Sequence, residues 1–167
     1  MKLKIVNYLN IIIGGINMKL LNLIKKNKDV RCYSYCIGLK YDRILKDANG
    51  RWENTDINTI TQIVMEDLKK LKIPSRIVDK NFKPSHGEKL LALRFSTLYH
   101  DGDYYHDIDY HMVIKKQDGY WYSKFYGTPV KRLEPNVDLN QWNWRDGKKV
   151  IRKNHYDSEI SYIAVKC

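Results

Sequence analysis

The sequence predicts an α+β domain in which N-terminal helices pack on an antiparallel sheet formed by the second half of the chain. The chain has 167 residues, which is the size of one ordinary domain. Apolar residues at helical spacing occur only in the first half, whereas alternating or continuous apolar runs bounded by turn signals fill the second half. Helices followed by consecutive strands are typical of an α+β layer fold.

The first 17 residues are expected to lie outside this domain. They resemble a weak secretory signal, but asparagines interrupt the apolar part and no small-residue cleavage site follows. Gly14-Gly15 can be encoded by a bacterial ribosome-binding sequence at a suitable distance before Met18. We therefore expect residues 1–17 to be an over-annotated or disordered leader, with Met18 as the natural start and residues 18–167 as a single domain.

Two helices are predicted after a basic lead-in at residues 18–29. Cys32, Cys36 and Leu39 are spaced so that they share one helical face. The next helix begins at Asn58 as N-cap and continues to about residue 72, before Pro74.

Four longer strands are predicted, at residues 89–96, 107–116, 120–126 and 158–166, with short strands around Val130 and Val150. Gln117-Asp118-Gly119 is a hairpin turn signal between two of them. In the strand at 107–116, Tyr110, Met112 and Ile114 alternate with Asp109, His111 and Val113.

Composition limits the classes of function. The net charge of +11 attracts polyanions such as nucleic acid, anionic lipid or cell-wall polymers, although an AT-rich genome also explains abundant Lys and Asn. No apolar run is long enough to span a membrane, and three Cys are too few for a disulfide scaffold. Free thiols favour a cytoplasmic location, although secretion stays open.

Cys32 and His111 are the residues best suited to catalysis. A sulfur at a helix N-terminus is stabilised as thiolate by backbone N–H groups and the helix dipole. A thiolate nucleophile needs a base or an imidazolium partner, and His111 lies mid-strand on the same face as Asp109. Cys36 competes as the nucleophile one turn further on, whereas Cys167 is expected to be a mobile terminal thiol without a function.

The order of Cys on an early helix and His on a strand resembles the papain-like cysteine hydrolases, and is closest to the compact NlpC-type branch that cuts peptides in bacterial cell walls. Several segments are also similar to an uncharacterised group of bacterial and phage proteins. These are Arg31-Cys32-Tyr33-Ser34-Tyr35, Asp109-Tyr110-His111, Gly119-Tyr120-Trp121, Ser123-Lys124, Thr128-Pro129-Val130 and Tyr162-Ile163-Ala164-Val165.

The resemblance implies a cysteine peptidase or amidase with Cys32 as nucleophile and His111 as base. Its substrate would be an amide or acyl bond in a cell-wall peptide or a protein, and it would need no cofactor. Asp109 or Ser123 would orient the imidazole. The group often has His where this chain has Ser123, a small apolar residue where it has Cys36, and an Asp-Pro step after Val150 that this chain lacks.

The same segments are also compatible with other functions. The stretch from His100 to His111 supplies three imidazoles and four carboxylates, a donor set that a metal ion accepts, although its spacing matches no defined motif. The aromatic residues from Tyr120 to Tyr126, with Trp142 and Trp144, could stack on bases or sugars, but only Lys124, Lys131 and Arg132 supply basic residues among them. The main alternative to a hydrolase is a non-catalytic basic binding module, such as a phage or bacterial effector that holds a polyanion or a host protein.

Overall fold

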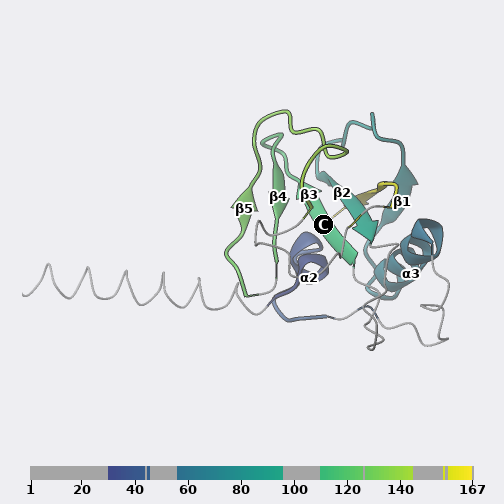
Figure 1. Ribbon diagram of the computed structural model, residues 1–167. Coiled ribbons are helices and arrows are strands. Elements are labelled where there is room, and N and C mark those ends of the chain that lie inside the picture. Colours follow the sequence, from purple (N-terminus) through teal and green to yellow (C-terminus); the bar gives the residue numbers. More distant parts are fainter. Residues whose placement is uncertain are drawn as a thin grey trace, which may run out of the picture.

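The computed structural model describes residues 30–43, 45, 56–95, 110–125, 127–144, 156 and 158–166 (Figure 1). The predicted leader, the basic lead-in, Asp109, the strand around Val150 and Cys167 lie outside these residues. In the part described, no helix is both long and apolar enough to cross a membrane.

The α+β class with an antiparallel sheet is confirmed. Among the described residues, two helices precede six strands, which are arranged in the order β1-β6-β2-β3-β4-β5. The elements are α2 (Cys32–Cys36), α3 (Ile57–Lys70), β1 (Ser75–Val78), β2 (Glu88–Phe95), β3 (Tyr110–Lys115), β4 (Trp121–Ser123), β5 (Lys131–Arg132) and β6 (Ser161–Lys166). All five strand pairings in the described part of the chain are antiparallel, and β6, the last strand, returns to pair with both β1 and β2.

Helix α3 begins one residue after Asp56, so the predicted N-cap at Asn58 is wrong by two positions. The Asp56 carboxylate accepts a hydrogen bond from the backbone N–H of Thr59 at 2.7 Å. This bond satisfies one of the N–H groups that a helix start leaves without an intrahelical partner. The helix ends at Lys70 and Leu71, and Lys72 then adopts a positive φ before Pro74.

Strand β1 was not predicted from the sequence. It has four residues and pairs with β6, so it forms one edge of the sheet. Its side chains do not alternate between buried and exposed, and Ile77 is 50 % exposed. The periodicity that identifies a strand is therefore missing from this segment.

The two central strands bury side chains on both faces of the sheet. On one face, Leu91 pairs with Ile114 and Leu93 with Met112, and these residues pack against the helices. We call this cluster the helix-side core. It contains Cys32, Tyr33, Cys36, Ile37, Leu45, Ile60, Ile63, Val64, Leu68, Leu91, Leu93, Phe95, Met112, Ile114, Ile163 and Val165.

The opposite face is covered by the chain that follows β5. Leu133, Leu139 and Trp144 pack there against Leu90 and Val113. The Trp144 indole N–H donates to the carbonyl of Leu139 at 2.8 Å, which fixes the ring against the sheet. We call this cluster the aromatic-side core, and the sheet is therefore the middle of three layers.

The hairpin between β3 and β4 turns where the sequence predicted. Gly119 has a φ of +82°, which a residue with a side chain rarely adopts. The N–H of Lys116 donates to the carbonyl of Tyr120 and the N–H of Gly119 to the carbonyl of Lys116. This tight turn brings the ends of β3 and β4 side by side.

Candidate functional site

Cys32 lies in the helix-side core and is 9 % exposed. Its Sγ is 4.0 Å from the carbonyl oxygen of Tyr110, and the Sγ of Cys36 is 3.6 Å from the carbonyl oxygen of Met112. Helix α2 has only five residues, and the side chain of its N-cap, Arg31, makes no capping hydrogen bond. Both sulfurs therefore face the backbone of β3 from the helix side, and both thiols are buried.

His111 lies in β3, between Tyr110 and Met112, and its side chain points to the other face. Its ring is stacked on that of Phe125, with centroids 4.0 Å apart and planes 1° apart. The rings of Trp142, Trp144 and Tyr156 also surround it, at centroid distances of 6.4, 6.2 and 5.8 Å.

The His111 imidazole is neutral in this environment. Burial lowers its pKa from 6.5 to about 3, because a charged imidazolium would lose its hydration among apolar rings. Its Nε2 is 3.0 Å from the Oγ of Ser123, and both side chains are buried. The hydroxyl satisfies the polar edge of the ring, which is what a core histidine requires.

The predicted contact between Cys32 and His111 is wrong. Tyr110 and Met112 point toward the helices, so the alternation of the strand turns His111 away from them. The sheet itself separates the sulfur from the imidazole. Of the four predicted site residues, the structure brings together only His111 and Ser123, while Asp109 lies outside the described residues.

The error has a physical reason. When only one face of a strand is buried, the apolar side chains reveal which face is turned to the core. All four central residues of β3 are buried, so this criterion fails here. The sequence predicted correctly that His111 and Val113 lie on the opposite face to Tyr110 and Met112, but not which of the two faces is covered by the helices. Residues 133–144 form the layer that buries His111, and they have no helical or alternating apolar pattern from which this layer could be predicted.

The predicted metal-binding stretch stays a prediction, because residues 100–109 lie outside the residues that the structure describes. Its last member, His111, is instead enclosed by aromatic rings. Within residues 30–43, 45, 56–95, 110–125, 127–144, 156 and 158–166, no three His, Cys, Asp or Glu side chains come close enough to hold a metal ion.

A group of four cations lies at one edge of the sheet, and the sequence had pointed to only two of them, Lys131 and Arg132. Lys115 ends β3, Lys116 follows it, and Lys131 and Arg132 form β5, the edge strand. Register brings them together, because Lys115 pairs with Trp121 on β4 and Arg132 pairs with Tyr122 on the same strand. We call Lys115, Lys116, Lys131 and Arg132 the basic edge. Lys116, Lys131 and Arg132 are exposed, and Lys115 is half-buried.

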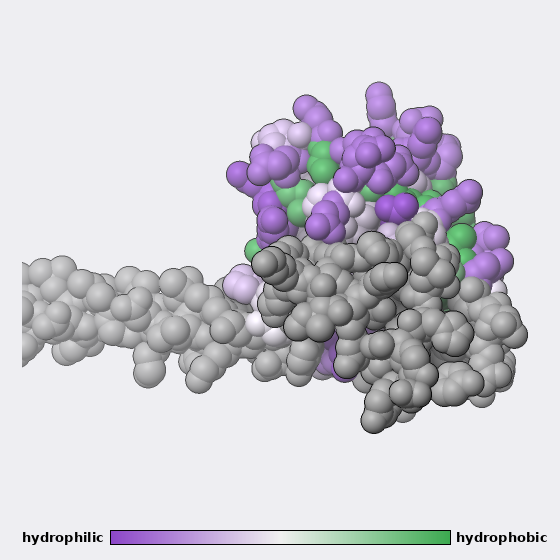
Figure 2. Space-filling model, viewed as in Figure 1, coloured by the Kyte–Doolittle hydropathy of each residue, from purple (hydrophilic) through white to green (hydrophobic). Residues whose placement is uncertain are grey.

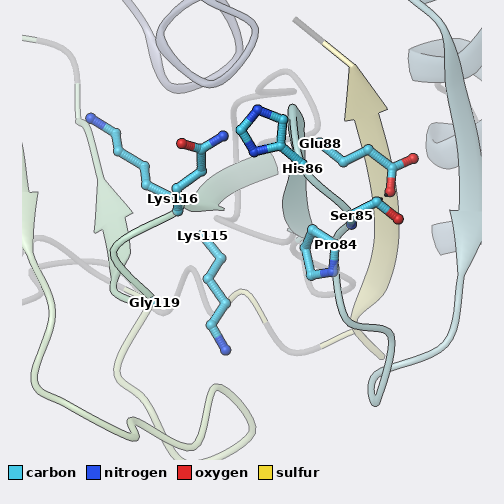
Figure 3. Close-up of a pocket in the computed structure, with 8 residues that line it drawn as sticks. Pro84, Ser85, His86, Glu88, Lys115, Lys116 and Gly119 are labelled. Carbon is cyan, nitrogen blue, oxygen red and sulfur yellow. Dashed lines mark hydrogen bonds between the residues drawn. The ribbon is translucent and has the colours of Figure 1, made fainter.

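A pocket of about 340 Å³ lies beside the basic edge (Figure 3). One wall is the entry to β2, with Pro84, Ser85, His86 and Glu88, and the other is the hairpin, with Lys115, Lys116, Gln117 and Gly119. In Figure 3 the side chains of Lys115 and Lys116 extend in different directions.

Glu88, the acidic residue of the pocket lining, is already engaged. Its Oε1 is 2.6 Å from the guanidinium of Arg76, and its Oε2 accepts from the N–H of Ser85 at 2.9 Å. Both bonds favour the carboxylate and lower its pKa. The negative charge of Glu88 is therefore balanced by Arg76. Lys115 and Lys116, which also line the pocket, can attract an anionic ligand.

The coloured part of the surface in Figure 2 is mostly hydrophilic, with smaller hydrophobic areas between the polar side chains. No protein-family model matches the chain, and no solved structure matches it significantly.

Proposed function

We propose that the protein is a non-catalytic binding domain that holds a polyanion through the basic edge. The observation that carries this proposal is the placement of Cys32 and His111 in two separate cores. Cys32, His111 and Ser123 are packed as core side chains, and the basic residues at the sheet edge are mostly exposed.

The charges at this edge are suited to an extended anion. Four cations lie on or next to neighbouring strands, and the whole chain carries +11. Lysine and arginine side chains that replace the counterions of a polyanion release those ions, which makes binding favourable and sensitive to salt. If all four cations contact the ligand, the logarithm of the affinity should fall with the logarithm of salt with a slope of about −3 to −4.

The cysteine hydrolase and its papain-like, NlpC-type architecture stay predictions from resemblance. Such an enzyme would need a base other than His111, because the sheet separates this ring from Cys32. The described geometry therefore favours the binding module, of the kind a bacterial or phage effector would use.

Fluorescence anisotropy with labelled inorganic polyphosphate tests the proposal. The variant Lys131→Gln, Arg132→Gln removes two cations of the basic edge. We expect its affinity to fall about tenfold at moderate salt and its salt slope to decrease by about 2. Lys69→Gln, Lys70→Gln is the matched control, because it removes the same charge from exposed positions at the end of α3.

The control should bind with less loss than the edge variant. Equal losses in the two variants would show that net charge alone drives binding, with no dedicated surface. Absence of binding by the wild-type protein at low salt would also overturn the proposal.

A further inference from the structure

Aromatic rings accompany the cations of the basic edge. The Nζ of Lys116 is 4.3 Å from the centroid of the Tyr122 ring and 5.3 Å from that of Tyr35. The guanidinium carbon of Arg132 is 4.6 Å from the centroid of the Tyr120 ring. These pairs come from three different elements and the hairpin turn, so only the folded chain brings them together.

Tyr120 and Tyr122 are partly exposed, unlike the buried Trp121 in the same hairpin, whereas Tyr35 packs against the helix-side core with its hydroxyl buried. The ring of Tyr122 is further held by its hydroxyl, which donates to the carboxylate of Asp118. A planar guanidinium lying over Tyr120 presents a flat cationic surface, and such surfaces stack on nucleobases. The edge therefore offers both charge and flat rings to a ligand.

The cations are also spread out instead of converging on one point. Consecutive residues of a strand point to opposite faces, and Lys115 lies over the Trp121 ring, whereas Lys116 lies over Tyr122. Figure 3 shows the two side chains leaving the pocket in different directions. A single small anion could not bind both, but an extended chain with regularly spaced charges could.

We propose that the polyanion bound by the basic edge is a single-stranded nucleic acid, an inference that rests on the proposed function. Proteins that bind single strands combine cations for the phosphates with aromatic rings for the bases. Lys116 contacts phosphates, whereas the Arg132 guanidinium supported by the Tyr120 ring, and the exposed part of the Tyr122 ring, stack with bases. A polyanion without bases gains nothing from these rings.

Two ligands of equal charge test this inference on the wild-type protein. One is a twelve-residue oligothymidylate, and the other is an abasic twelve-residue deoxyribose-phosphate chain with the same label. We expect the oligothymidylate to bind at least about tenfold tighter, because stacking adds to the phosphate contacts. The salt slopes of the two ligands should be equal, because both lose the same counterions.

Two pairs of substitutions at Tyr120 and Tyr122 test whether these rings cause the preference for oligothymidylate. Tyr120→Leu, Tyr122→Leu removes the rings and should lower the affinity for oligothymidylate to that for the abasic chain, with little change in the latter. Tyr120→Phe, Tyr122→Phe keeps both rings and should retain most of the preference. Circular dichroism of each variant confirms that it is folded.

The outcomes separate the two proposals. Equal binding of both chains by the wild-type protein would overturn the nucleic-acid inference and leave the polyanion proposal standing. Failure to bind either chain or polyphosphate would overturn both. A preference for oligothymidylate that survives in the leucine variant would overturn the assignment of stacking to these tyrosines.

Discussion

The buried imidazole of His111 should make the fold sensitive to mild acid. In the folded state its pKa is about 3, whereas in the unfolded chain it returns to about 6.5. Above pH 6.5 the ring is neutral in both states and the pH has no effect through this group. Below pH 6.5 the unfolded chain binds a proton that the folded chain does not, so stability decreases as the pH falls toward 3.

The size of the effect follows from the shift. Each unit between the two pKa values corresponds to about 1.4 kcal/mol. Between pH 6.5 and pH 5 the free energy of unfolding should therefore fall by about 2 kcal/mol through His111 alone. Carboxylates contribute little in this window, because their ordinary pKa values lie near 4.

Urea unfolding followed by tryptophan fluorescence measures this difference at pH 7 and at pH 5. The variant His111→Gln keeps a hydrogen-bonding group toward Ser123 but does not titrate. It should be less stable than the wild type at pH 7, since it loses the stack on Phe125, yet it should lose about 2 kcal/mol less on acidification. His86→Gln is the control, because His86 is exposed, and it should retain the wild-type acid sensitivity. An unchanged acid sensitivity in His111→Gln would refute the placement of a neutral imidazole in the aromatic-side core.

Three further predictions concern the helix side. Asp67→Asn should cost about 2 kcal/mol in urea unfolding, because Asp67 accepts two hydrogen bonds from Arg43 at 2.7 and 2.6 Å; a cost below 0.5 kcal/mol would contradict the role of this pair. Asp56→Ala should lower the urea midpoint of unfolding, and Asp56→Asn should lower it much less, since an amide oxygen can still accept from the N–H of Thr59; equal losses would argue against the cap. Cys32 should react with iodoacetamide at pH 6 no faster than it does in the urea-unfolded chain, because it is buried against a carbonyl. A reaction rate of Cys32 well above its rate in the unfolded chain would instead support the cysteine hydrolase.

The elements with strong periodicity could be predicted from the sequence. Helix α3 buries the apolar residues Ile60, Ile63, Val64 and Leu68 at helical spacing, and β2 contains the apolar run from Leu90 to Leu93, so both were located within two residues. The turn at Gly119 was found because its residue types fit a specific backbone conformation. Strand β1 was missed because its half-exposed edge position leaves no pattern.

The candidate site depended on distances that no local pattern encodes. The choice between Asp56 and Asn58 as helix cap is decided by one backbone N–H, since either side chain is suitable. The basic edge was only partly predicted, because Lys115 and Lys116 come beside Lys131 and Arg132 only through the pairing of β3 and β5 with β4. Residues 133–144 cover His111 without any helical or alternating apolar pattern from which this layer could be predicted.

A one-residue shift of β3 is the smallest change that would turn His111 toward Cys32. The side-chain period of a strand is two, so this shift would move every residue of β3 to the opposite face. Met112 and Ile114 would leave the helix-side core, where they are 0 % and 2 % exposed. Burial of two such side chains stabilises the fold by about 3 to 6 kcal/mol, a large part of the roughly 5 to 15 kcal/mol that stabilises a domain.

The same shift would separate His111 from Ser123 and Phe125, so it would disrupt both cores at once. Turning His111 toward Cys32 by such a shift would therefore cost a large part of the stability of this fold. The exposed cations Lys116, Lys131 and Arg132 need no such rearrangement, because their side chains can contact a ligand without disturbing either core. This difference in cost is the physical reason to look for function at the edge of the sheet before looking in its interior.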